Sequence, residues 1–166
     1  MFELWQKISN RWLYLCGALF ASGLMGFGLY LQYAKHQDPC PLCMVQRVIF
    51  IAILAVFALA ALHGPKRVGE RSYAALIALL SLSGVGVAAR HIWLQNLPED
   101  QVPACGPGLD YMLEIMPMTE VLKQLMHGSG ECAEKGWTFL TIGIPEWSLL
   151  CYLALGAWAV LIAVRK

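Results

Sequence analysis

Residues 40–63 read CPLCMVQRVIFIAILAVFALAALH, so that two cysteines directly precede an uninterrupted apolar run. An α-helix of about 20 apolar residues spans the ~30 Å hydrocarbon core of a bilayer. The run therefore predicts a membrane-spanning helix over about 44–63. Comparable runs lie at about 13–34, 72–94 and 145–164. We expect an all-α membrane protein, a bundle of four transmembrane helices.

The composition agrees with this prediction. Hydrophobic residues make up 58% of the 166 residues and charged residues 14%, whereas soluble domains have about 25% charged residues. The net charge is +1 and no basic cluster is present, which argues against a nucleic-acid partner. We expect residues 1–166 to form a single membrane domain in contact with lipid. The first run is longer than the hydrophobic part of a signal peptide and no clear cleavage site follows it, so we expect it to be retained.

The distribution of basic residues predicts the orientation of the bundle. They gather at both ends of the chain and in the 64–71 loop: Lys7, Arg11, Lys66, Arg67, Arg71, Arg165 and Lys166. The positive-inside rule places these segments, and hence both termini, in the cytoplasm. Segments of about 35–43 and 95–144 then lie outside. The longer one holds seven acidic residues and two lysines, which supports the same orientation.

The long outer segment, 95–144, is expected to contain a short helix. Apolar residues cluster around Thr119 and Glu120, namely Met116, Met118, Val121, Leu122, Leu125 and Met126. Thr119 has a side chain suited to capping the helix N-terminus. The apolar face either packs beneath the fold of the loop itself or lies on the membrane surface.

Cys40 and Cys43 form a CxxC motif at the start of the second expected span. A helix N-terminus stabilises a thiolate, and Arg47 follows Cys43 by one turn on the same helix face. Such a motif is redox active, a structural disulfide or half of a zinc site. Because structural zinc takes four ligands and the remaining cysteines lack the usual spacing, we expect redox activity and no metal.

Cys105 and Cys132 lie 27 positions apart in the long outer segment. A disulfide between them would stabilise the loop by roughly 3–4 kcal/mol on a chain-entropy estimate. Such a bond persists outside the reducing cytosol. It is either purely structural or, with the CxxC motif in the same compartment, part of a relay. Cys16 and Cys151 lie in opposite leaflets, too far apart to pair, and we expect them to be packing residues.

Arg47 and His91 are the polar candidates near the outer ends of the spans. A charge within a span is costly and usually functional, although an Arg near a helix end can also reach the headgroups. The neighbouring CxxC motif favours a role for Arg47 toward a thiolate or an oxygen-bearing ligand. His91 joins this site only if its helix end meets Cys43.

Together these residues resemble the DsbB family of bacterial inner-membrane, disulfide-generating proteins. The resemblance covers nearly the whole chain and rests on Cys40-Pro41-Leu42-Cys43, Arg47, Arg90-His91-Ile92-Trp93-Leu94-Gln95, Cys105, Gly130-Glu131-Cys132-Ala133-Glu134, Trp137-Thr138-Phe139-Leu140 and Pro145-Glu146-Trp147. It implies a protein-dithiol:quinone oxidoreductase of the inner membrane, with its active site on the periplasmic face.

The resemblance also implies the disulfides Cys40–Cys43 and Cys105–Cys132. A reduced, DsbA-like thioredoxin-fold protein would attack Cys105, and the released Cys132 would attack Cys40. Cys43 would then face a bound quinone as a thiolate, and the quinol would pass its electrons to the respiratory chain. We expect ubiquinone, with menaquinone as the alternative.

In the same resemblance, Arg47 stabilises the thiolate and the developing charge on the quinone oxygen, and His91 lies near the quinone, where it supports quinone binding or proton delivery. Other interpretations remain open. The chain could be a structural membrane protein braced by loop disulfides, or a metal-binding membrane protein. It could also be a quinone reductase of the vitamin K epoxide reductase type, although the CxxC motif of that type is expected in the fourth core helix.

Overall fold

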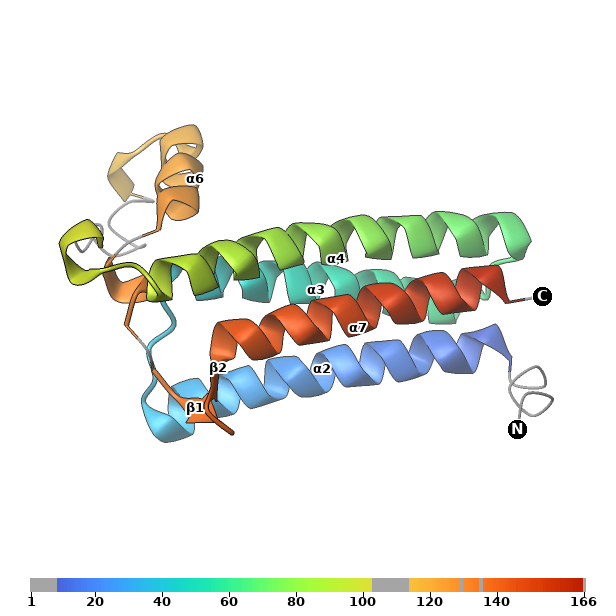
Figure 1. Cartoon of the computed structure of the whole chain (residues 1–166). Helices are drawn as coiled ribbons and strands as arrows, with labels where there is room; N and C mark the ends of the chain where they lie inside the picture. Colours follow the sequence, from blue (N-terminus) through green and yellow to red (C-terminus); the bar gives the residue numbers. More distant parts are fainter. Residues whose placement is uncertain (1–8, 103–113, 129, 135, 166) are drawn as a thin grey trace.

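The computed structural model describes residues 9–102, 114–128, 130–134 and 136–165. Within these residues, four long helices lie side by side in a bundle (Figure 1). They are α2 (Asn10–Lys35), α3 (Pro41–His63), α4 (Arg67–Gln95) and α7 (Ile144–Val164). Each is long and apolar enough to cross a membrane. The expected all-α fold is therefore confirmed.

The helices extend beyond the apolar runs, mostly at their N-terminal ends. α2 and α3 each begin three residues before the predicted span, α4 five residues before and α7 one residue before. The extra first turn of α4 contains Arg67, Glu70 and Arg71. Hydropathy marks only the apolar length, whereas charged residues continue a helix into the polar zone.

The first residue of α2 and the last of α7 lie at the same end of the bundle, since Arg165 Nη1 donates to Asn10 Oδ1 at 3.3 Å. The Arg11 guanidinium donates to the carbonyls of Ala61 and Leu62 at 3.1 and 2.9 Å. A cation is favourable at such a helix C-terminus. We call the opposite end, formed by residues 36–40, 96–102, 114–128, 130–134 and 136–143, the loop end. Its placement outside the cytoplasm stays a prediction.

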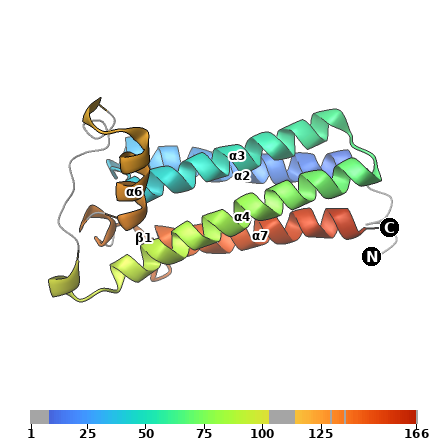
Figure 2. The same ribbon diagram turned by 90° about the horizontal axis from the view of Figure 1, so that it is seen from above.

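Short elements cover the loop end. They are η1 (Glu99–Gln101), α6 (Met118–His127), η2 (Gly130–Cys132) and an antiparallel hairpin of β1 (Thr138–Phe139) and β2 (Ile142–Gly143). α6 lies across the bundle axis in both views (Figures 1 and 2). The expected short helix is thus present in the long loop.

α6 packs over the end of α3 and buries Val121, while Met118 stays 70% exposed. The prediction that Thr119 caps this helix is wrong. α6 begins at Met118, and the Pro117 carbonyl accepts from the N–H groups of Glu120 and Val121. Proline restricts its own backbone to a helix-compatible φ, which suits this position.

The packing between helices is uneven. α4 lies closely along α7, and α2 along α3, whereas α2 and α7 touch only sparsely. A Cβ atom on Gly84 would lie 2.5 Å from the Tyr152 ring, and one on Gly17 would lie 2.5 Å from the Phe57 ring. Small residues of this kind permit close helix contacts in membranes. The sparse α2–α7 contact leaves room for cavities between these helices.

Candidate functional site

The CxxC motif forms the first turn of α3. Cys40 is the N-cap residue, and its Sγ accepts from the Cys43 N–H at 3.4 Å. Pro41 follows in the first turn, where its fixed φ favours the helix. The Sγ atoms of Cys40 and Cys43 lie 3.1 Å apart, against about 2.05 Å in a disulfide. The structure therefore presents this pair as thiols, and the Cys40–Cys43 disulfide stays a prediction.

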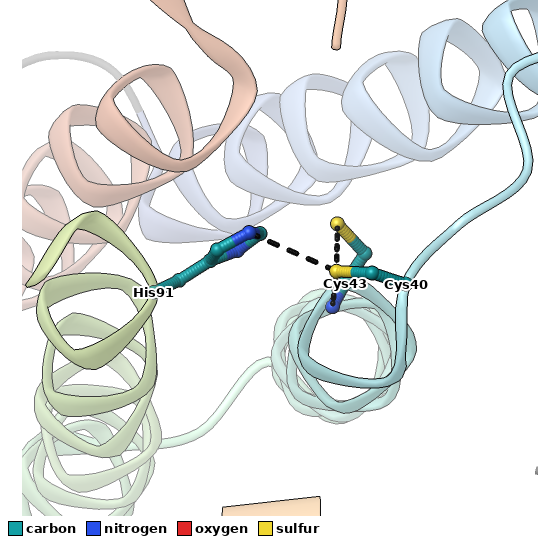
Figure 3. A group of neighbouring side chains, drawn as sticks. All are labelled: Cys40, Cys43 and His91. Carbon is teal, nitrogen blue, oxygen red and sulfur yellow. Dashed lines mark hydrogen bonds between the residues drawn. The ribbon is translucent and has the colours of Figure 1, made fainter. Parts of the chain in front are cut away.

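His91 of α4 joins this motif. Figure 3 shows its ring pointing toward Cys40, and Nε2 lies 3.7 Å from Cys40 Sγ. On the other side of the ring, Nδ1 lies 3.2 Å from Gln46 Nε2. Both His91 and Gln46 are buried. The end of α4 thus meets the CxxC motif, with the imidazole within 3.7 Å of the Cys40 sulfur.

Arg47 reaches across to α2. Its Nη1 donates to Gln32 Oε1 at 2.5 Å, and its Nη2 donates to the Gly28 carbonyl at 3.1 Å. The guanidinium is half-buried between helices. Headgroup contact alone therefore does not account for this charge, since protein groups within the bundle hold it.

An apolar cavity of about 330 Å³ lies between α2, α3 and α7, beside Cys43 and Arg47. The other residues that line it are Leu24, Met25, Phe27, Gly28, Leu31, Gln37, Asp38, Pro39, Gln46, Phe50, Trp137, Phe139, Ile144, Trp147, Ser148 and Cys151. A volume of this size is typical of small-molecule sites. The three spanning helices give it mostly aliphatic and aromatic walls.

A row of aromatic rings closes the apolar cavity at the loop end. Phe27 packs edge-to-face on Trp137 with centroids 5.4 Å apart, Trp137 stacks on Phe139 at 6.0 Å, and Phe139 meets Trp147 at 6.2 Å. The backbone N–H of Trp137 donates to Gln37 Oε1 at 2.8 Å. The hairpin is thereby fixed over the gap between α2 and α7.

A polar cavity of about 360 Å³ lies on the other side of Cys43, toward the loop end. Its walls contain Cys40, Cys43, His91, His36, Gln37, Asp38, Gln95, Glu131, Glu134, Gly136, Trp137, Thr138, Thr141, Gly143, Ile144, Pro145 and Glu146. Cys43 lines both cavities. Arg47 lines the apolar cavity, whereas Cys40 and His91 line the polar one.

Cys132 lies in η2, fully buried beside the CxxC motif. Its side chain forms a cluster with Leu42, Val87 and Leu94, against which Cys40 packs. Cys105 lies outside the described residues, so its pairing with Cys132 stays a prediction. Cys132, one cysteine of this predicted pair, nevertheless lies beside Cys40 of the CxxC motif.

Three features of the site were missed by sequence reasoning. Gln46 contacts His91, the aromatic row closes the apolar cavity, and Cys151 lines that cavity although we expected a packing residue. For Gln46 a signal existed, because it is an uncharged polar residue within an apolar run. Cys16 lines a separate groove of about 300 Å³ between α2 and α7.

The family model described as "Disulfide bond formation protein DsbB" matches residues 10–162. The chain belongs to the DsbB family. Disulfide bond formation protein B of Hahella chejuensis is 52% identical over 153 residues, which cover 92% of this chain and 93% of the relative. The protein of that name from Nitrosococcus oceani is 47% identical over 150 residues, covering 90% and 89%. Disulfide bond formation protein B 1 of Pseudomonas aeruginosa is 42% identical over 158 residues, covering 95% and 97%.

Membership of the DsbB family assigns the chain a role in disulfide formation, as a disulfide-generating oxidoreductase. Together with the candidate spans, it makes the chain a multi-pass membrane protein. This assignment favours the disulfide-forming interpretation over a vitamin K epoxide reductase type. Disulfide formation requires thiols that lie close together, as Cys40, Cys43 and Cys132 do.

Proposed function

We propose that this chain is a thiol:quinone oxidoreductase of the bacterial inner membrane, which reoxidises a periplasmic DsbA-like dithiol protein. The proposal rests mainly on one observation, that Cys43 lines both the apolar and the polar cavity. A thiol in this position can exchange electrons with sulfur on one side and with a lipid-soluble acceptor on the other.

The sulfur steps follow from thiolate attack on disulfides. A thiolate of the partner attacks Cys105 of the Cys105–Cys132 disulfide, which forms a mixed disulfide and releases Cys132 as a thiolate. Cys132 then attacks Cys40 of the Cys40–Cys43 disulfide and releases Cys43. The second thiolate of the partner closes the partner's own disulfide and releases Cys105, which attacks Cys132 of the Cys132–Cys40 disulfide and frees Cys40. The burial of Cys132 against the cluster that Cys40 contacts supports the middle step, since proximity makes it intramolecular.

The apolar cavity has the chemistry that a quinone requires. Its aromatic rings offer stacking surfaces, and the Arg47 guanidinium offers hydrogen-bond donors to an oxygen that gains negative charge. The hydrogen bonds to Gln32 and Gly28 hold this guanidinium in place. When bound, the quinone accepts two electrons and two protons and leaves as quinol for the respiratory chain. We propose ubiquinone, with menaquinone as the alternative.

His91 is better suited to proton transfer at Cys40 than to direct contact with the quinone. Its Nε2 lies 3.7 Å from Cys40 Sγ, and it lines the polar cavity. Cys40 must lose a proton before it can close the disulfide with Cys43. A histidine within hydrogen-bond reach of a thiol is a suitable acceptor for that proton.

The test is stopped-flow absorbance of the detergent-purified protein with a soluble ubiquinone analogue and a reduced DsbA-type protein. We expect quinone consumption that requires the dithiol protein, Cys43 and Cys105. The variants Cys43→Ser and Cys105→Ser should each lose it. Cys16→Ser is the matched control, because Cys16 lines a groove away from the site.

Turnover that persists in Cys43→Ser would contradict the proposed path. Quinone reduction without any dithiol protein would show that the electrons have another source. A folded protein that neither binds nor reduces the quinone would favour the structural alternative, in which the loop disulfides only brace the fold.

A further inference from the structure

We propose that the reduced CxxC pair and His91 form a binding site for a thiophilic divalent cation such as Zn²⁺, and that oxidation of the pair abolishes this site. One potential ligand atom from each of Cys40, Cys43 and His91 lies within 4.8 Å of the other two. Binding rests only on these residues, while its effect on turnover rests on the proposed function.

The geometry is close to that of a tetrahedral zinc site. Zinc binds sulfur at about 2.3 Å and imidazole nitrogen at about 2.0–2.1 Å, which separates the two ligand atoms by about 3.6 Å. The observed separation of Cys40 Sγ and His91 Nε2 is 3.7 Å. The two sulfurs, 3.1 Å apart, would have to separate to about 3.8 Å. Side-chain rotation at the start of α3 can supply this small change.

The contact with Gln46 already orients the His91 ring. A metal-bound histidine usually forms a hydrogen bond through its other ring nitrogen, and His91 Nδ1 lies 3.2 Å from the buried Gln46 amide. Rotation of that amide presents its oxygen to an Nδ1–H group. The Tyr152 hydroxyl donates to the Gln46 carbonyl at 2.7 Å and fixes the backbone there.

The polar cavity supplies a route for a cation. Carboxylates of Asp38, Glu131, Glu134 and Glu146 line it together with the three ligands. Among the described residues, Glu146 Oε2 is buried without a hydrogen-bond partner. Negative charge in a cleft raises the local concentration of cations. Water in the same cavity can complete the coordination, as in zinc sites with three protein ligands.

Metal binding at this site would depend on the redox state. Cys40 and Cys43 bind a metal as thiolates, and a disulfide removes both ligands as two electrons leave to the quinone. A bound cation would occupy the Cys40 and Cys43 thiolates and hinder their return to the disulfide. We therefore expect zinc to inhibit the reduced protein and to leave the oxidised form unaffected until its first turnover.

The test is titration of the full-length, detergent-purified protein with Co²⁺, which reports thiolate ligation by charge-transfer absorption, followed by competition with Zn²⁺. Because Cys105 and Cys132 also become thiols on reduction, the Cys105→Ser, Cys132→Ser double variant is the background. After reduction with a phosphine, we expect one tightly bound Co²⁺ per chain. The same protein oxidised with diamide should show no such absorption, and this comparison requires no further substitution.

In that background, Cys40→Ser should abolish the absorption, and His91→Ala should weaken binding by at least about 10-fold. His63→Ala and Cys16→Ser are matched controls and should leave binding unchanged, since His63 ends α3 and Cys16 lies near the start of α2, both away from the first turn of α3. No thiolate absorption in the reduced background would overturn the proposal. So would absorption that survives oxidation or the Cys40→Ser substitution. No quinone or partner is present, so the result is independent of the turnover experiment.

Discussion

The apolar and polar cavities meet at one sulfur, yet their walls have opposite chemistry. The apolar cavity is lined by aliphatic and aromatic side chains of α2, α3 and α7, with Arg47 as its cationic group. The polar cavity is lined by carboxylates, histidines and the hairpin. A lipid-soluble electron acceptor suits the apolar cavity, and a dithiol protein in aqueous solution suits the polar cavity. Five residues line both cavities, and Cys43 is the one sulfur among them.

The start of α3 makes this arrangement possible. Cys40 caps the helix and Cys43 lies three residues later, in its first turn. Within this short segment Cys40 faces His91 and the polar cavity, whereas Cys43 also reaches the apolar cavity. A CxxC motif at a helix N-terminus thus gives its two sulfurs different surroundings. We expect substitutions in the two cavities to affect different substrates.

The largest effect is expected for Cys43→Ser. Quinone reduction should fall by roughly 1,000-fold or more, because the nucleophile acts as part of one catalytic unit. Cys40 should still form a disulfide with Cys132, because its thiolate can attack the Cys105–Cys132 disulfide and release Cys105. Quinone absorbance measures quinone reduction, and non-reducing peptide mapping measures formation of the Cys40–Cys132 disulfide. Loss of both quinone reduction and the Cys40–Cys132 disulfide would argue against a role of Cys43 toward the quinone alone.

A smaller loss is expected for Arg47→Met. Removal of a donor to a developing oxyanion typically costs 10²–10³-fold in turnover, so we expect roughly 100-fold. Arg47→Lys should recover only part of it, because lysine lacks the planar fork that reaches both Gln32 and Gly28. The rate of quinone reduction under saturating dithiol protein is the measurement. Full activity in Arg47→Met would remove this residue from the site.

Phe27→Ala should act on the quinone side alone, because Phe27 lines the apolar cavity and not the polar one. It removes the α2 member of the aromatic row, and an aromatic pair contributes about 0.5–1.5 kcal/mol beyond area burial. We expect a KM for quinone raised by about 10-fold, with the KM for the dithiol protein unchanged. Glu134→Gln in the polar cavity is the paired variant and should leave the KM for quinone unchanged. An equal effect of both variants on the KM values of both substrates would contradict the assignment of the two cavities to different substrates.

Gly84→Ala should reduce stability more than it alters either substrate. The added methyl group would overlap the Tyr152 ring, and overpacking of this kind typically costs 1–3 kcal/mol. Gly86→Ala on the same helix is the control, since nothing lies within 4 Å of its Cβ position. Thermal denaturation in detergent compares the two variants. Equal midpoints for both would contradict the close α4–α7 contact.

Much of the fold could be predicted because hydropathy reports the spans directly. The runs at about 44–63 and 145–164 correspond to α3 and α7 to within three residues at each end. The exact starts could not be predicted, because Arg67 and Glu70 continue α4 beyond its apolar part. The capping preference of threonine gave a wrong start for α6 at Thr119, because the Pro117 carbonyl accepts the first hydrogen bonds of this helix.

The site was predictable where its residues are close in sequence. Cys40, Cys43 and Arg47 fall within two turns of α3, so their spacing carried the information. His91 could be placed only conditionally, because its neighbour Cys40 depends on how α4 packs against α3. The aromatic row joins Phe27, Trp137 and Trp147 from α2, the loop end and α7. No local pattern links such distant positions.

The most direct test of the account is to locate the bound quinone with a photoreactive quinone analogue, followed by peptide mass spectrometry. We predict cross-links to walls that belong to the apolar cavity alone, within residues 24–31 and 147–151. Excess ubiquinone should compete for them. Competed cross-links confined to the walls of the polar cavity, or to the groove beside Cys16 and Trp158, would contradict it.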